Sequence, residues 1–507
     1  MIQAFAPRNP RGYSWVLLTI AALFVCAGVA DAQTTKARSK TATGTSKTKD
    51  DASKDDEPKA KDASKKDDDE PNEKKGEKAD AAKGEAPAEE PEAPKKEPAI
   101  EVFKDPRAEA ILQKKFTTIG RLPDQSKKSV VNMAVGAENA DRAVIQRFVD
   151  GATYMLTNPA NVAALVEGKG GSKALEIKKG TDDLLEVLHK AQANKNTAFL
   201  TEYNRILVAT LPKLLENNLF ARIEAMIVLG QTGNPEAIPV FVKQLADANQ
   251  TVWVKIWAAR GITSAAGGGT REVAAAQAGT AAKAIADWLD KEKDLPWFAQ
   301  MRALEALGAL RQAKTPQKPD QPVFANVAMR FLADKEARPE VRAMAAWALG
   351  MMRIDNALSK FNFSLVAHNV AEVAADLGDK VVDVFDANQN QSRYYTSFLL
   401  YQIHPALEGD PKVRDAGILK VPGNHAGFNQ AKPFLQQVDD LVKSVYKASV
   451  ELLNAPRGKQ KDLQKQLANR VDALRKFLQK NPPADTRLVP GGQAFPGNQV
   501  AAAPDGK

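Results

Sequence analysis

Between about residues 214 and 352 the chain repeats one pattern of apolar and polar positions four times. Each copy begins with a basic or amide side chain, has apolar residues three and four positions later, and ends in an aliphatic residue, followed in three copies by glycine. In the last copy the apolar positions recur at steps of three and four, which is the spacing of one helix face. The copies are Arg222–Gly230, Lys255–Thr263, Gln300–Gly308 and Arg342–Gly350, and their first residues are 33, 45 and 42 positions apart.

Each copy is expected to contain a pair of helices, because a second apolar segment ending in an acidic residue, such as Leu332-Ala333-Asp334, precedes the later copies. Gly230 and Gly350 stand where a helix would end in a left-handed cap. Pro235 and Pro339 are expected near the first turn of the next helix. A period near 40 built from two helices is typical of a solenoid, in which each pair buries its apolar face against its neighbours.

These residues resemble HEAT repeats of the short bacterial kind related to the phycobilisome-lyase group. The turn Thr232–Pro239 and the segment Arg338–Arg342 are similar to the turn and second-helix motifs of that family, and the resemblance covers roughly residues 210–355. It implies an α-solenoid of the ARM/HEAT type. In the family, acidic and basic side chains form a structural ladder between repeats, and the resemblance gives that role to Asp247, Lys255, Asp334 and Arg342. The alternative is that these are solvated charges on a helical surface.

The segments on either side of the copies also read as helical, so the fold class is all-α. Residues 100–213 are expected to form degenerate N-terminal repeats, residues 214–355 the HEAT-like repeats, and residues 356–430 helices with loops. Residues 432–481 carry apolar positions at alternating steps of four and three on both sides of a break at Pro456 and Gly458, which predicts an antiparallel helical hairpin. This hairpin either packs on the end of the solenoid or serves as a dimerisation or docking arm. Residues 482–507, rich in Pro, Gly and Ala, are expected to be a disordered tail.

The first 32 residues are expected to be an export signal. An apolar run over residues 15–30 follows two arginines, and Ala30-Asp31-Ala32 fits a cleavage site. The run is shorter than the roughly 20 residues of a spanning helix, which favours a cleaved signal over a membrane anchor through residues 15–30. Cys26, the only cysteine, lies in this run, so the mature chain would contain no disulfide and no thiolate site. The expected location is the periplasm or cell envelope.

Residues 33–99 are expected to be a disordered, charged, low-complexity linker. Between Thr34 and Pro98 there are 16 basic and 18 acidic side chains and no aromatic one, so little apolar surface could be buried. The whole chain has a formal charge of +9, the first 33 residues have +1 and the linker has −2, so residues 99–507 have about +10. A basic domain favours anionic surfaces. The expected partner is therefore a protein, an anionic envelope polymer or a membrane surface. Nucleic acid is not favoured, because no basic cluster is interleaved with aromatics.

The sequence contains no recognisable catalytic, cofactor or metal motif. The four histidines (His189, His368, His404 and His425) show no metal-ligand spacing. The glycine-containing segment 167–173 does not match a phosphate-binding loop, and Asp386–Gln391 lacks the glycine and glutamate of a calcium loop. We therefore expect a non-catalytic scaffold. The alternative is an enzyme or lyase-like enzyme subunit that uses the groove of the solenoid. A polar cluster around one histidine would support this alternative, and His404 is the histidine that we consider first.

Overall fold

The computed structural model describes residues 117–166, 172–292 and 294–495. The chain divides into two compact units, residues 1–98 and 99–507, and all described residues belong to the second. Its described elements are helices, and no β-strand occurs in these ranges, so the prediction of an all-α fold is confirmed. The expected signal or anchor (1–32) and the expected linker (33–99) lie outside the described residues.

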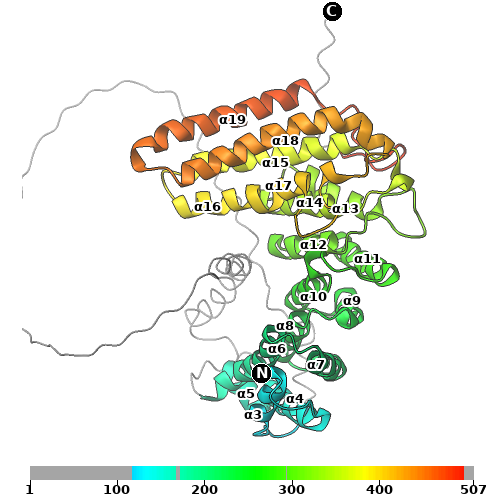
Figure 1. Cartoon of the computed structure of the whole chain (residues 1–507), viewed down its shortest axis with the longest axis vertical. Coiled ribbons are helices and arrows are strands. Elements are labelled where there is room, and N and C mark those ends of the chain that lie inside the picture. Colours follow the sequence, from blue (N-terminus) through cyan, green and yellow to red (C-terminus); the bar gives the residue numbers. More distant parts are fainter. Residues whose placement is uncertain (1–116, 167–171, 293, 496–507) are drawn as a thin grey trace, which may run out of the picture. The chain divides into compact units, whose positions relative to one another are not determined.

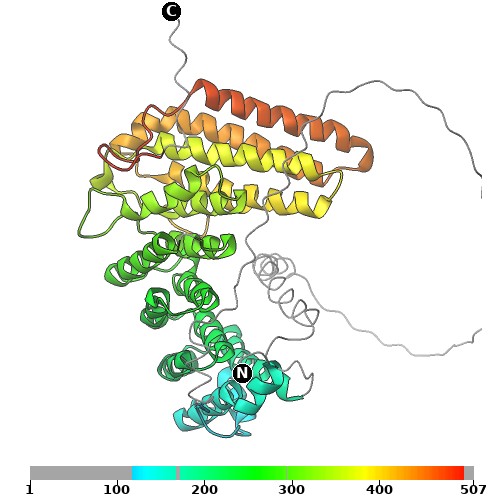
Figure 2. The same ribbon diagram turned by 180° about the vertical axis from the view of Figure 1, so that it is seen from behind.

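The central part of the second unit has two layers of helices (Figure 1). In the inner layer each helix packs on the one before it and the one after it, and its helices are α8 (Leu219–Gln231), α10 (Val252–Ala265), α12 (Trp297–Ala309) and α14 (Pro339–Met351). The outer layer consists of α9 (Ile238–Ala246), α11 (Ala275–Lys291) and α13 (Val323–Ala333). Each sequence copy supplies one inner helix, and the apolar segments ahead of the second, third and fourth copies supply the three outer helices. The segment ahead of the first copy lies in a 3-10 helix. Figure 2 shows the same two layers from behind.

The N-terminal described helices continue from α8. α6 packs on α8 and on α4, and α3, α5 and α7 each pack on both α4 and α6. Their bounds are α3 (Lys127–Val135), α4 (Arg142–Thr157), α5 (Pro159–Val166), α6 (Ser172–Ala193) and α7 (Thr197–Thr210), followed by a 3-10 helix (Leu211–Glu216). Asp141 caps α4 by accepting hydrogen bonds from the backbone N–H groups of Ala143 and Val144, at 2.8 and 3.1 Å, which fixes the start of the helix.

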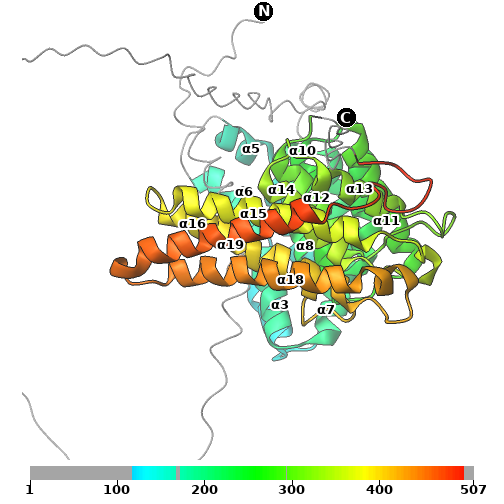
Figure 3. The same cartoon turned by 90° about the horizontal axis from the view of Figure 1, so that it is seen from above.

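Beyond α14 the chain forms a bundle around a long buried helix, α15, which packs against α14, α16, α18 and α19. The bounds are α15 (Phe363–Val384), α16 (Gln389–Phe398), a π-helical turn (Leu399–Ile403), α17 (His404–Glu408), α18 (Ala426–Leu453) and α19 (Gln460–Lys480). α18 and α19 run side by side along α15 (Figures 1 and 3). The hairpin expected at residues 432–481 is therefore present, and it packs on α15.

Two sequence expectations need correction. Gly230 and Gly350 are not left-handed caps, because both lie inside helices and neither has a positive φ. They allow close packing: a Cβ at Gly230 would lie 3.3 Å from the Cα of Gly261, and one at Gly350 would lie 2.5 Å from the Cα of Ala406. Glycine is needed at these positions because the backbones of two helices are in contact. A close helix contact and a left-handed cap both select glycine, so the motif alone does not show which of the two applies.

The expected disordered tail, 482–507, is ordered in its first part. Residues 482–495 form an ordered strap across the start of α15: Leu488 is fully buried, and its carbonyl accepts a hydrogen bond from the backbone N–H of Asn362 at 2.8 Å. The side-chain amide of Asn362 donates to the carbonyls of Asp485 and Arg487, at 3.0 and 3.2 Å. A Pro- and Gly-rich composition suggested disorder, but two buried apolar side chains, Leu488 and Phe495, anchor the segment. Residues 496–507 lie outside the described part.

Candidate functional site

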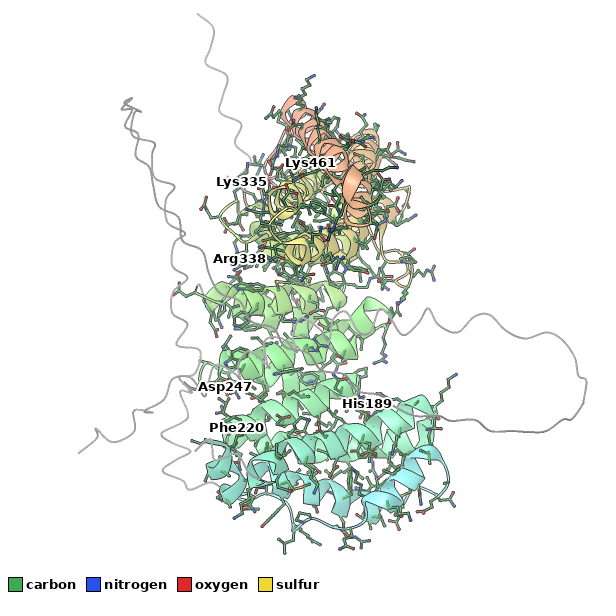
Figure 4. The ribbon with its side chains drawn as sticks, turned by 90° about the vertical axis from the view of Figure 1, so that its left-hand side faces the viewer. His189, Phe220, Asp247, Lys335, Arg338 and Lys461 are labelled. Carbon is green, nitrogen blue, oxygen red and sulfur yellow. The ribbon has the colours of Figure 1, made fainter. Side chains whose placement is uncertain are left out.

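Partly exposed aromatic side chains gather at the N-terminal ends of the inner helices. Trp253 at the start of α10 stacks on Phe298 at the start of α12, with ring centroids 5.5 Å apart and an interplanar angle of 16°. Phe298 meets Trp297 edge-on at 5.9 Å, and the guanidinium of Arg338, before α14, lies over the Trp297 ring at 4.6 Å. We call these four residues, with Phe220 of α8, the aromatic strip. Phe220 and Arg338 lie along one edge of the helix stack (Figure 4).

The strip follows from the sequence repeat. Phe220, Trp253 and Phe298 each stand two positions before the first residue of a copy, so they occupy the same place on successive inner helices. Stacking the copies therefore places these rings in a row. The strip was not predicted from the sequence, because the alanines define the copies most clearly. The aromatic residue two positions before three of the copies was the signal that could have revealed it.

At its Arg338 end the strip lies beside α16. In the fourth copy the same position holds Glu340, which is buried and is bonded by Arg338, with Nη2 to Oε1 at 3.3 Å. The hydroxyl of Tyr394 on α16 lies 3.5 Å from the same carboxylate. Burial, and then the negative charge of Glu340, raise the pKa of the Tyr394 phenol. Arg338, Glu340 and Tyr394 thus join the inner layer to the C-terminal bundle, and about two-fifths of the Arg338 side chain stays exposed.

A second polar arrangement surrounds His404 on α17. Its Nε2 lies 3.6 Å from Oε2 of Glu408, one turn on, and its ring stacks on Tyr446 of α18 at 5.0 Å. Lys443 of α18 pairs with Glu408 and with Asp439, whose Oδ2 is 2.8 Å away. We call these five residues the His404 cluster. The signal for it was His404 itself, but its partners come from α18 and no sequence spacing connects them.

Charges in the His404 cluster largely compensate one another. Hydrogen bonds from Lys443 lower the pKa of Glu408, and its bonds to Asp439 and Glu408 raise the pKa of Lys443. Burial raises the pKa of Asp439, whose side chain is 8% exposed and whose Oδ1 has no hydrogen-bond partner. His404 Nδ1 also has none. Lys443, Glu408 and Asp439 thus link α17 to α18, and this link gives the three charged groups a structural role.

The π-helical turn beside this cluster has a local cause. Pro405 has no N–H to donate to the carbonyl four residues earlier, and its ring needs a wider turn, so the helix between α16 and α17 expands at residues 399–403. The turn exposes Tyr401, which is 55% accessible.

The other sequence-selected residues have structural roles. His425 is fully buried and caps α18, its Nδ1 accepting from the N–H of Phe428 at 3.3 Å. His368 is buried on α15, and burial lowers its pKa. His189 is exposed on α6, away from Phe220 (Figure 4). Asn388, in the segment 386–391, caps α16 by accepting from the N–H groups of residues 390 and 391. The segment 167–173 lies mostly outside the described residues.

Basic residues that open the copies form forward links between neighbouring repeats. Lys255 of α10 pairs with Glu292, at the end of α11, and Arg342 of α14 pairs with Asp376 of α15 at 2.5 Å. Arg222 of α8, fully buried, donates to Oε1 of Gln250 at 2.6 Å. The two aspartates expected in a ladder also accept local hydrogen bonds, Asp247 from the backbone N–H of residue 249 and Asp334 from that of residue 336. The acid partners of Lys255 and Arg342 thus lie further along the chain than the aspartates that the motif suggested.

No group of three His, Cys, Asp or Glu side chains in the described part of the chain is arranged to bind a metal ion. None of the described helices combines the length and apolar character that a bilayer crossing needs. The residues 15–30 that the sequence offers as an anchor lie outside the described residues. Comparison with protein families, curated proteins and solved structures finds no match for this chain.

Proposed function

We propose that the chain is a non-catalytic binding scaffold and that the aromatic strip is its contact surface. The observation that carries the proposal is the row of partly exposed rings with an arginine at its end. Tryptophan and arginine are the side chains that most often dominate the energy of protein interfaces. The rings sit on helix ends that are fixed by close packing, so little ordering is needed on binding.

We also propose that residues 214–355 form an α-solenoid of HEAT-like repeats. Three features support it: alternation of inner and outer helices, packing of each inner helix on its immediate neighbours, and polar links from one copy to the next. A solenoid repeats the same surface position at regular intervals, which is what makes a linear strip available.

The expected partner is a protein, with an anionic envelope polymer as the competing ligand. Full-length chain would be immobilised and exposed to a native envelope fraction at low and at moderate salt. A single stoichiometric protein that survives moderate salt, and whose binding weakens at least about tenfold in Trp297→Ala and in Arg338→Gln, supports the proposal. Tyr401→Ala, which removes an exposed ring away from the strip, is the control.

Equal binding by the strip variants and the control would contradict the assignment of the strip. Capture of polymer or lipid only at low salt would mean that the basic charge of the domain, and not the strip, is the working feature. Circular dichroism of each variant separates loss of binding from loss of folding.

Export remains part of the proposal and rests on the sequence of residues 1–32. N-terminal sequencing of the protein recovered from cells tests it directly. A mature chain beginning at Gln33 is the expected result, and a chain that keeps residues 15–30 and remains in the membrane fraction would favour the anchor.

The second candidate function is an enzyme or enzyme subunit, which the His404 cluster favours. A histidine beside a carboxylate, a lysine and a tyrosine has the groups for proton transfer. Turnover of an envelope component by the full-length chain that disappears in His404→Gln, but not in His189→Gln, would establish it. Turnover unchanged in His404→Gln would remove this cluster from consideration.

A further inference from the structure

Arg311 lies just beyond the end of α12, and part of its guanidinium group is buried without a hydrogen-bond partner. Its backbone is left-handed (φ 58°), a conformation that glycine adopts without strain and other residues rarely do. Its side chain is folded inward, so the residue is only 7% exposed. Nε donates to the carbonyl of Met351 at 3.2 Å, and Nη2 is buried without a hydrogen-bond partner.

Other charged groups surround Arg311 but pair with each other. Arg353, just after α14, is bonded to Glu272, with Nη2 to Oε1 at 2.9 Å. In the loop between α17 and α18, Arg414 pairs with Asp415, with Nε to Oδ2 at 3.2 Å. Three guanidinium groups thus face two carboxylates, and both carboxylates already have a partner other than Arg311. Among the described residues no carboxylate lies within 4.0 Å of the Arg311 guanidinium.

The surroundings hold Arg311 in this position. Val413 and Ala416 pack on Met351, which fixes the loop that carries Asp415, another residue with a left-handed backbone (φ 54°). On the other side, a Cβ at Gly269 would lie 2.5 Å from Cε of Met351 and 3.7 Å from Cδ of Arg311. A strained, buried residue persists where the structure around it is tightly packed, and such strain is concentrated at functional sites.

Positive charge is not fully compensated around Arg311. Burial, followed by the positive charge of Arg353, lowers the pKa of the Arg311 guanidinium, and the two carboxylates oppose this only in part. A buried guanidinium with one hydrogen bond and no counter-ion is costly unless an anion completes it. An arginine guanidinium binds carboxylate and phosphate groups through two parallel N–H groups.

We propose that Arg311 and Arg353 form a binding site for an oxyanion group, a phosphate, a sulfate or a carboxylate, at the C-terminal ends of α12 and α14. The anion would accept hydrogen bonds from both guanidiniums and displace Glu272, whose side chain is 81% exposed, from Arg353. The site lies at the opposite ends of the inner helices from the aromatic strip, and it is independent of the proposed scaffold function. Nothing in the repeat motif suggests it, because Arg311 follows the copy that ends at Gly308.

The test is a calorimetric titration of the full-length chain with inorganic phosphate, with ionic strength held constant by sodium chloride. Saturable binding is expected. Arg311→Gln should weaken it at least about tenfold, because a charge-assisted hydrogen bond is lost. Arg311→Lys keeps the positive charge but loses the two parallel N–H donors of the guanidinium, so its phosphate affinity should lie between those of the parent and Arg311→Gln. Glu272→Gln removes the competing carboxylate and should strengthen binding several-fold. Arg470→Gln, on the exposed face of α19, is the charge-matched control.

Titrations with sulfate and with acetate under the same conditions distinguish the sources of the oxyanion. Phosphate binding that is equal in Arg311→Gln and Arg470→Gln, or no saturable binding, would overturn the proposal. Circular dichroism shows whether Arg311→Gln folds. If it does not, Glu272→Gln decides: its side chain is largely exposed, so it should fold, and unchanged affinity in that variant would also overturn the site.

Discussion

At the scale of single residues, the glycine that closes three of the four copies has its role defined by the neighbouring helix. A Cβ at Gly308 would lie 2.8 Å from the Cα of Ala348 and 2.8 Å from the ring of Trp347. The sequence predicts a glycine requirement at this position but assigns it to helix capping, because a cap and a backbone contact both select glycine. Only the position of the next helix distinguishes the two.

Gly308→Ala is expected to destabilise the fold by about 1–3 kcal/mol, because the added methyl group must push two inner helices apart. Gly458→Ala is the matched control, since a Cβ there has nothing within 4 Å. The free energies of unfolding from urea titrations of the two variants check this. A Gly308→Ala variant as stable as the control would show that the inner helices can separate at little cost.

Glu186 provides a prediction about acid stability. Hydrogen bonds from Lys127, and then Lys190, lower its pKa to about 2. Because the folded pKa lies below the unfolded value, the contribution of Glu186 to stability is present above about pH 4.5 and is lost as the pH falls toward 2. The Glu186→Gln variant should therefore lose stability less steeply than the parent over this window. Glu451→Gln, on the exposed face of α18, serves as the control, and equal slopes in both variants would contradict the assignment.

At the scale of elements, polar links that point forward along the chain join successive repeats. Arg342, 4% exposed, reaches Asp376 on α15 and donates from Nε to the carbonyl of Leu332 at 3.1 Å. The sequence identifies the basic end of each link, because that residue opens the copy. It does not identify the acidic end, because Asp376 and Glu292 occupy different positions relative to their copies.

Arg342→Ala should destabilise the protein by about 2 kcal/mol, because charged hydrogen bonds to two partners are lost in a buried place. Lys283→Ala breaks an exposed pair with Asp287 on α11, and should cost less than about 1 kcal/mol. Chemical denaturation of the two variants measures the difference. Similar losses would mean that burial of Arg342 adds nothing to its pair.

At the scale of the whole second unit, the strap of residues 482–495 closes the C-terminal bundle over the start of α15. The helices and their pairing in this region could be predicted, because α18 and α19 carry regular apolar spacing. The strap could not be predicted, since it has no periodicity and its backbone carbonyls accept hydrogen bonds from the backbone N–H and the side-chain amide of Asn362. The His404 cluster and the Arg311 site were hidden for a related reason: their members come from segments that only the fold brings together.

Leu488→Ala is expected to destabilise the protein by about 2–5 kcal/mol, because the side chain is fully buried and its removal leaves a cavity. Val489→Ala, next to it and partly exposed, should have an effect below about 1 kcal/mol. Thermal unfolding of both variants measures the two effects. Equal melting temperatures would show that the strap is not part of the cooperative fold.

The fixed offset of Phe220, Trp253 and Phe298 within the first three copies has a consequence for how this surface could change over generations. Neighbouring packed helices are about 8–10 Å apart, so duplication of one copy would lengthen the row of rings by that amount and leave the existing rings in place. The length of the binding surface would then increase by the same amount with each added copy. A longer ligand could be matched by counting units, without redesign of any single contact.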